Sequence, residues 1–137
     1  MWREWPQKRG FENILIMEVK MSVAKVLDRE TWAERPDVWK GEFEGGIYGA
    51  NVSVVFYTTD EIGGGPKLHK HPYPEVFIIR QGRALVTVGT DEIEATAGQI
   101  VFAPADVPHK FSNLGPGRLE TTDLHVAGAF STEWLKE

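Results

Sequence analysis

The segment GGGPKLHKHPYPEVFIIRQG, residues 63–82, sets two histidines and a glutamate between glycine-containing turns. His69 and His71 are two positions apart, so on a strand both side chains point to the same face. Glu75 opens the next apolar run, and His109 begins a later one. Three imidazoles and one carboxylate form a ligand set that suits a divalent transition metal. The sequence therefore predicts a metal site formed by these four residues.

Short strand-like runs separated by Gly and Pro continue on both sides of this segment. They predict strands at 51–59, 67–71, 75–81, 84–89, 93–96, 100–103, 109–113 and 119–126. Many short strands with regular breaks are typical of an all-β sandwich or barrel.

The flanking regions predict smaller elements. Residues 11–27 contain apolar runs that predict one or two short strands, and 28–34 predicts a short helix. Gly45 and Gly46 predict a tight hairpin turn between 40–44 and 47–48. Ser131 is a candidate cap for a short C-terminal helix over 131–137.

Two motifs in the chain resemble those of the cupin superfamily. The first is Gly63-x5-His69-x-His71-x3-Glu75-x6-Gly82, which matches the family pattern at every position. The second is Gly98-x5-Pro104-x-Asp106-x2-His109-x3-Asn113, which departs from it only at Asp106, where the family has Gly.

The resemblance covers about residues 50–126. It implies a double-stranded β-helix (jelly-roll) barrel with short peripheral helices. It also implies one divalent metal ion (Fe, Mn, Ni, Cu or Zn), held inside by the motif His and Glu residues. If the turn at Asp106 needs a positive φ, Asp tolerates it better than most residues.

Size and composition limit what the chain can be. Its 137 residues fit one domain, which we place at 28–137, preceded by an N-terminal arm at 1–27. A net charge of −5 argues against a nucleic-acid partner, and no apolar run is long enough for a membrane helix. The absence of Cys excludes disulfides and a cysteine nucleophile, and we expect a cytoplasmic protein. Met1, Met17 and Met21 are all possible starts.

Several side chains are candidates for binding a small-molecule ligand. His125 shares one strand face with Asp123 and Thr121. It is either a pocket residue, acting as a catalytic acid/base or as a hydrogen-bond partner of the substrate, or a surface residue or one that supports a metal ligand from outside the site. Lys67 has the parity of His69, which places it either at the pocket mouth or at a solvated strand end. The inward-facing aromatic candidates, serving as core or as substrate contacts, are Phe56, Phe77 and Phe111.

Five tryptophans lie outside the two motifs. They are Trp2, Trp5, Trp32, Trp39 and Trp134. Trp is enriched at protein interfaces, so this distribution predicts either packing on the outer face or a subunit contact. The family resemblance favours the contact, and we expect a homodimer in which residues 1–27 pack on the second subunit.

Two functional classes remain open from the sequence. One is a metal-dependent enzyme, a dioxygenase, decarboxylase or isomerase, acting on a small carboxylate or enolisable substrate. The other is a non-enzymatic module that binds a small molecule. The fold alone cannot separate them, because many functions share it.

Overall fold

The structure, a computed structural model, describes residues 23–137. One helical turn, α2 (Arg29–Trp32), and one 3-10 turn, η1 (Gly45–Tyr48), accompany ten strands in this part of the chain. The strands are β1 (Gly41–Glu44), β2 (Ser53–Thr59), β3 (His69–Lys70), β4 (Glu75–Gln81), β5 (Arg83–Val88), β6 (Asp91–Thr96), β7 (Ile100–Ala103), β8 (His109–Asn113), β9 (Leu119–His125) and β10 (Glu133–Trp134). No helix within 23–137 has the length and apolarity that crossing a membrane requires.

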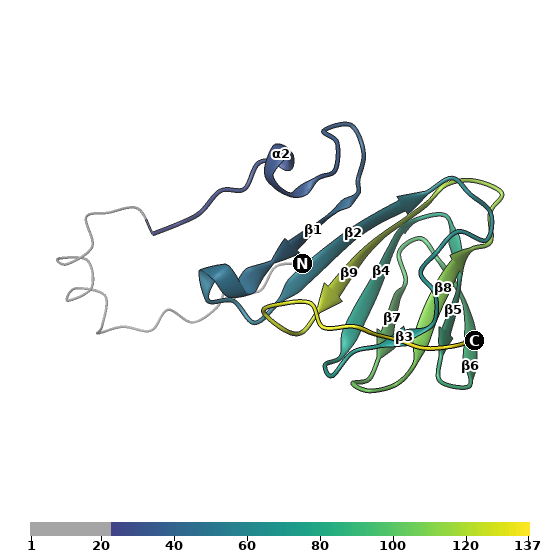
Figure 1. The fold of residues 1–137 in the computed structure, drawn as a ribbon. Helices are drawn as coiled ribbons and strands as arrows, with labels where there is room; N and C mark the ends of the chain where they lie inside the picture. The colour runs from purple at the N-terminus through teal and green to yellow at the C-terminus, as the bar shows by residue number, and fades with distance from the viewer. Residues whose placement is uncertain (1–22) are drawn as a thin grey trace, which may run out of the picture.

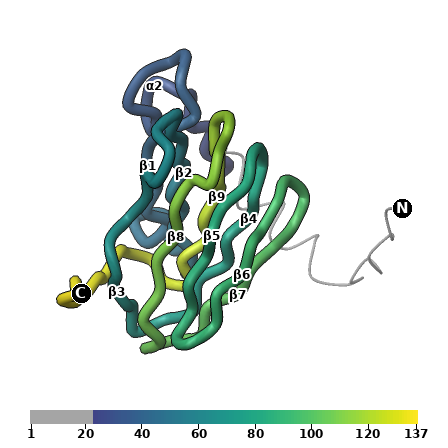
Figure 2. The backbone as a smooth tube through the Cα atoms, turned by 90° about the vertical axis from the view of Figure 1, so that its right-hand side faces the viewer, coloured from purple at the N-terminus to yellow at the C-terminus, as the bar shows by residue number. Residues whose placement is uncertain are grey.

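The strands form two five-stranded sheets that face each other (Figures 1 and 2). One sheet has the order β1-β2-β9-β4-β7 and the other has the order β10-β3-β8-β5-β6. Every paired strand is antiparallel to its neighbour. The all-β jelly-roll architecture expected from the sequence is therefore confirmed.

Alternate residues of each long strand point between the sheets. Strand β9 shows this period of two over its whole length, because every second residue is buried. The apolar core between the sheets consists of Phe77, Ile79, Ala84, Val86, Ala95, Val101, Ala103, Phe111 and Leu119.

The interior changes from apolar to polar along the strands. The inward residues of β9 run from Leu119 through Thr121 and Asp123 to His125. Strand β4 runs the other way, so Glu75 lies opposite His125. One end of the barrel is consequently a packed apolar core, and the other end is a cluster of buried polar groups.

The turn before β8 confirms the expectation for Asp106. Its φ is 65°, the left-handed region that Asp tolerates better than most residues. Its backbone N–H donates to the carbonyl oxygen of His71 at 2.8 Å. This bond ties the loop that leads into β8 to the segment between β3 and β4.

Two local predictions are wrong. Residues 131–137 form no helix, because the backbone of 133–134 pairs with β3 instead and gives that edge a partner. The strand β1 forms its hairpin with β2 rather than with 47–48. Gly46 does not form a tight hairpin turn. It allows the backbone of Gly128 to pack closely, since a Cβ at Gly46 would lie 2.6 Å from the carbonyl oxygen of Gly128.

The N-terminal predictions fall mostly beyond the described part of the chain. Residues 1–22, with Trp2, Trp5 and most of the expected arm, lie outside it. Residues 23–27 form no strand. The interface expected for the arm therefore stays a prediction.

Phe56 lies on the outer face of β2, not in the interior. It pairs with Thr122 of β9, whose neighbours on either side point inward. Its ring packs against Trp32 at 4.1 Å and Trp39 at 5.1 Å between centroids. The expected inward position of Phe56 is thus wrong, and two of the five tryptophans cover this face.

Replacing Phe56 by Ala should lower the free energy of unfolding by about 1–3 kcal/mol, since the ring is half-buried. Trp32 and Trp39 should become more exposed, which a red shift of the fluorescence emission would report. Phe43→Ala is the matched control, because Phe43 stacks on Tyr48 away from this cluster. An emission spectrum unchanged in Phe56→Ala would contradict the packing described.

Candidate metal centre

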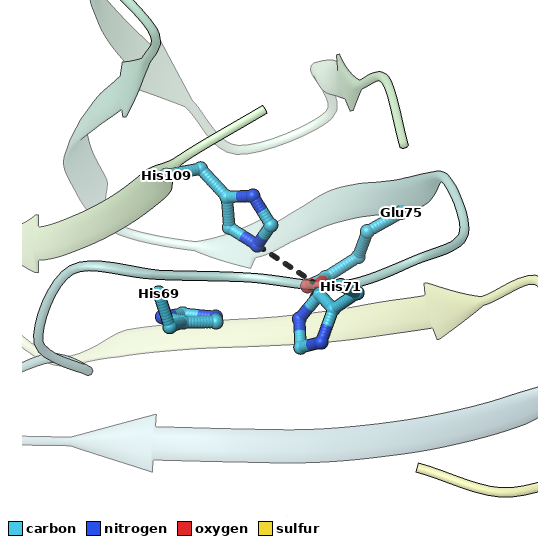
Figure 3. Close-up of side chains that lie close together, drawn as sticks. All are labelled: His69, His71, Glu75 and His109. Atoms are coloured by element: carbon cyan, nitrogen blue, oxygen red, sulfur yellow. Dashed lines mark ion pairs between the residues drawn. The ribbon is translucent and has the colours of Figure 1, made fainter. Parts of the chain in front are cut away.

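Four buried side chains converge at the polar end of the barrel. His69 begins β3, His71 follows it, Glu75 begins β4 and His109 begins β8. Their candidate ligand atoms all lie within 4.8 Å of one another. Figure 3 shows His69 and His71 on one segment and Glu75 and His109 on two others, with His109 directed at the Glu75 carboxylate. The sequence-predicted ligand set is therefore brought together as expected.

Hydrogen bonds to backbone carbonyls orient the three imidazoles. The Nδ1 atoms of His69, His71 and His109 lie 2.6, 2.8 and 3.0 Å from carbonyl oxygens. The carbonyls belong to Lys67, Ser131 and Val107, respectively. Because a carbonyl oxygen can only accept, each Nδ1 carries the proton. Each neutral ring therefore keeps a lone pair on Nε2, which is the arrangement that a metal-binding His requires.

The buried atoms of this cluster test whether a cation fits. Nε2 of His71 and Nε2 of His109 lie 2.9 and 3.3 Å from Oε1 of Glu75. None of these three atoms has a hydrogen-bond partner in the described structure. Unprotonated nitrogens facing a carboxylate at this distance repel each other unless a positive charge lies between them. The donor set and its unmet polar atoms thus fit a divalent transition metal.

The ionisation of the cluster agrees with this interpretation. Burial opposes the charged form of Glu75, but hydrogen-bonding and positive groups at the positions of His109 and His71 outweigh it and lower its pKa to about 2. A cation bound between these nitrogens would lower the pKa of Glu75 in the same direction. Burial lowers the pKa of His69, and it lowers the pKa of His125 to about 4. Near neutral pH Glu75 is therefore an ionised carboxylate beside the neutral imidazoles of His69 and His125, which suits metal binding.

A cavity of about 360 Å³ opens onto the cluster. Its walls combine the ligands His69, His71 and Glu75 with apolar and aromatic side chains that include Tyr57 and Phe111. Asp123 and His125 of β9 also line it. A space of this size suits a small organic molecule.

A C-terminal strap, residues 127–135, forms one side of the cavity through Phe130, Thr132 and Trp134. It is the yellow segment that runs past β3 in Figure 1. Its Ser131 carbonyl accepts the bond from His71, and its Trp134 ring lies 5.0 Å from the His69 ring. Phe130 packs edge-on against His125 at 4.9 Å. The strap therefore contacts three of the four histidines in the chain.

Comparison with known proteins agrees with the fold and the ligand set. Residues 56–125 match the family model of the cupin domain. This chain belongs to the cupin family. An uncharacterized protein of Streptomyces coelicolor is 35% identical over 81 residues, 59% of this chain and 70% of that protein. An uncharacterized protein of Methanocaldococcus jannaschii is 34% identical over 55 residues, 39% of this chain and 44% of that protein.

Solved structures show the same fold. A mutant of Bacillus subtilis oxalate decarboxylase superposes with a TM-score of 0.63 at 18% identity. The match covers 69% of this cupin and 27% of the decarboxylase chain. A cupin superfamily protein from Desulfitobacterium hafniense gives a TM-score of 0.52 at 17% identity, covering 56% of this chain and 68% of that one. At such identities the likeness shows the fold alone.

The other predicted site residues divide into two groups. His125 and Phe111 line the cavity, while Phe77 lies behind it in the core, with its ring 5.5 Å from that of His109. Lys67 does not line this cavity and borders a separate surface groove instead. Their contacts with a ligand stay predictions.

Sequence reasoning missed several residues that surround the metal centre. Tyr73 stacks on His71 with 4.9 Å between ring centroids and 7° between planes. Its position between two prolines in the ligand-bearing segment was the available signal. Trp134 and Thr132 were missed because the strap gave no strand pattern of its own.

Asp123 is a buried carboxyl without a compensating charge. Burial raises its pKa well above the usual range, and the negative charge of Glu75 adds to this effect. Oδ2 accepts a hydrogen bond from Thr121 at 3.2 Å, whereas Oδ1 has no partner in the described residues. At neutral pH this buried carboxyl therefore lowers the free energy of unfolding of the metal-free barrel.

Changing His71 to Ala should abolish stoichiometric metal binding, because it removes one of four converging donors. Elemental analysis of protein purified without a His tag measures this directly. The fold should persist, as judged by circular dichroism. Lys67→Ala is the control and should keep the wild-type metal content, because Lys67 lies outside the cavity. Full metal content in His71→Ala would overturn the ligand assignment.

Changing Asp123 to Asn should stabilise the metal-free protein at pH 7. The pKa of Asp123 is higher in the folded than in the unfolded protein, so the free energy of unfolding falls as the pH rises above the unfolded pKa. Asn has no proton to lose and avoids this decrease. The advantage over wild type should vanish at about pH 3, where the unfolded Asp is also protonated. Urea titrations with a chelator at both pH values test this. Glu92→Gln, at an exposed carboxyl, is the control and should show no such pH-dependent gain.

Proposed function

We propose that this cupin is a metal-dependent enzyme that acts on a small carboxylate or enolisable substrate. The reaction would be of the dioxygenase, decarboxylase or isomerase class. The observation that carries the proposal is the set of unmet Nε2 and Oε1 atoms facing a cavity of about 360 Å³. Such a set exposes a cation to a ligand instead of enclosing it completely.

The charges of the site favour an anionic oxygen donor. A divalent cation bound by three neutral imidazoles and one carboxylate would keep a net charge near +1 in a low-dielectric interior. When bound, such a cation acts as a Lewis acid that polarises a coordinated carboxylate or enolate. The role of His69, His71, Glu75 and His109 is to hold it at the cavity end.

The cavity walls limit the substrate further. Among the lining residues in the described chain there is no Lys or Arg, and Glu42 and Asp123 are acidic. A second carboxylate on the substrate would therefore find no cation beyond the metal. Tyr57 and Phe111 provide apolar contact for a compact body and exclude water from it. We expect a monocarboxylate or monoanionic enol to bind better than a dianion.

The neighbouring structures supply concrete probes. One of them concerns the Mn(II) centres of Bacillus subtilis oxalate decarboxylase. Mn(II) and oxalate are therefore included among the metals and compounds to be tested. Because oxalate is a dianion, it also tests the expectation that dianions bind more weakly than monoanions.

The deciding experiment strips the protein with a chelator and reloads it with Fe(II), Mn(II), Ni(II), Cu(II) or Zn(II). Each form is offered small 2-oxo acids, β-keto acids, catechol and oxalate, with and without O₂. Product formation, CO₂ release and O₂ uptake are measured. We expect turnover with at least one metal, none with Glu75→Gln, and an unchanged rate with Lys67→Ala. Metal-dependent binding of the panel without any turnover would instead favour the non-enzymatic binding module.

A further inference from the structure

A buried phenol and a buried imidazole outside the ligand set form a pair beside the metal centre. The hydroxyl of Tyr73 lies 2.7 Å from Nδ1 of His125. Across the ring, Nε2 of His125 lies 3.4 Å from Oε1 of Glu75. Both side chains are more than nine-tenths buried, and His125 also lines the cavity. His125 therefore lies between the Glu75 carboxylate and the Tyr73 hydroxyl, and within the described residues this hydroxyl makes no hydrogen bond to any of the four ligands.

The partners of Tyr73 determine the direction of this hydrogen bond. The backbone N–H of Ser131 donates to the Tyr73 oxygen at 3.3 Å. In the described chain the only acceptor recorded for the phenolic proton is Nδ1 of His125. A proton on that Nδ1 would leave the phenolic proton buried without an acceptor. The phenol therefore donates, and a neutral His125 carries its proton on Nε2.

This tautomer is the reverse of the one in the three ligand histidines. Their Nδ1 atoms lie 2.6–3.0 Å from carbonyl oxygens, which only accept, so their Nε2 atoms present lone pairs. Nδ1 of His71 also lies 3.2 Å from the Thr132 hydroxyl, which is farther away than the Ser131 carbonyl and accepts a hydrogen bond from Nδ1 or donates elsewhere. Nδ1 of His125 faces a hydroxyl that can donate, so its Nε2 presents a hydrogen. A protonated Nε2 cannot bind a cation, although it lies close to Glu75.

We infer that His125 is a hydrogen-bond donor to the metal centre, held in that tautomer by Tyr73, and that its Nε2–H binds an anionic oxygen of the substrate. In the absence of substrate this Nε2 lies 3.4 Å from Oε1 of Glu75 without a hydrogen bond to it. The inference rests on the proposed function for the nature of the substrate. It makes His125 a substrate-binding residue and not a fifth ligand, which leaves the remaining coordination positions free.

The surroundings hold the pair rigidly enough for this role. Tyr73 is fixed between Pro72 and Pro74 and stacks on the ring of His71. Phe130 packs edge-on against His125 from the C-terminal strap. A donor held in place before the substrate arrives loses little entropy on binding.

Nuclear magnetic resonance of ¹⁵N-labelled protein measures the tautomers directly, because two-bond ¹H–¹⁵N couplings distinguish the ring nitrogens. In metal-free protein, and in protein titrated with Zn(II), we expect the proton on Nε2 of His125. We expect it on Nδ1 of the other three. A proton on Nδ1 of His125, or on both of its nitrogens near neutral pH, would overturn the inference.

Tyr73→Phe tests the source of this tautomer. Removing the hydroxyl should move the Nδ1 resonance of His125 downfield, to the position of a nitrogen that accepts no hydrogen bond. Tyr57→Phe is the matched control, since Tyr57 lines the cavity but makes no recorded hydrogen bond to His125, and it should cause no such change. A His125 Nδ1 resonance that is unchanged in Tyr73→Phe would show that the phenol is not the donor.

Two substitutions at His125 test its role toward an anion. Acetate binding to the Co(II)-loaded protein is followed by the visible spectrum. His125→Gln keeps an N–H donor and should retain much of the affinity, whereas His125→Phe should lose about tenfold. Both should keep one metal ion per chain. Loss of metal in both variants to the extent seen in His71→Ala would make His125 a ligand and overturn the inference, as would equal acetate affinity in all three proteins.

These outcomes separate this inference from the proposed function. The tautomer in metal-free protein can be measured whether or not the protein turns over a substrate. Lack of turnover with an Nε2–H tautomer and His125-dependent acetate binding would refute only the enzymatic proposal. Turnover together with an Nδ1–H tautomer would refute only the role of His125.

Discussion

The geometry of the centre depends on three hydrogen bonds from imidazole Nδ1 atoms to backbone carbonyls. Each bond fixes the rotation of one ring and places a lone pair on its Nε2. The carbonyls lie on three separate segments, so the site is only as ordered as the backbone around it. Strand pairing and the Asp106 bond to the carbonyl of His71 supply that order. The donor atoms are thereby preorganised by the fold.

The ligand set could be predicted because it depends on short-range rules. His69 and His71 share a face through the period of two, and Glu75 and His109 begin strands whose inward parity is clear. Phe77 and Phe111 face the interior for the same reason. Phe56 was misplaced because no residue of known direction lies on its strand. Its face is decided by the register with β9, a non-local pairing that the sequence pattern of β2 does not encode.

The second layer around the site escaped prediction because its partners are distant in the chain. Tyr73 and His125 are 52 positions apart, and His71 and Ser131 are 60 apart. The strap around Trp134 has local features of a helix end, but pairing with β3 offers its backbone another set of hydrogen bonds. Tertiary contacts therefore override local preference where the strap meets the centre.

The ligands lie on both sheets, and this has a consequence for the energetics of the whole barrel. Glu75 belongs to the sheet that contains β4, whereas His69 and His109 belong to the sheet that contains β3 and β8. A bound cation would cross-link the two layers at their polar end, where no apolar core joins them. Its contribution to folding would follow mass action, with about 2.7 kcal/mol when free metal exceeds the dissociation constant a hundredfold. The resistance of the barrel to unfolding would then vary with the concentration of free metal around it.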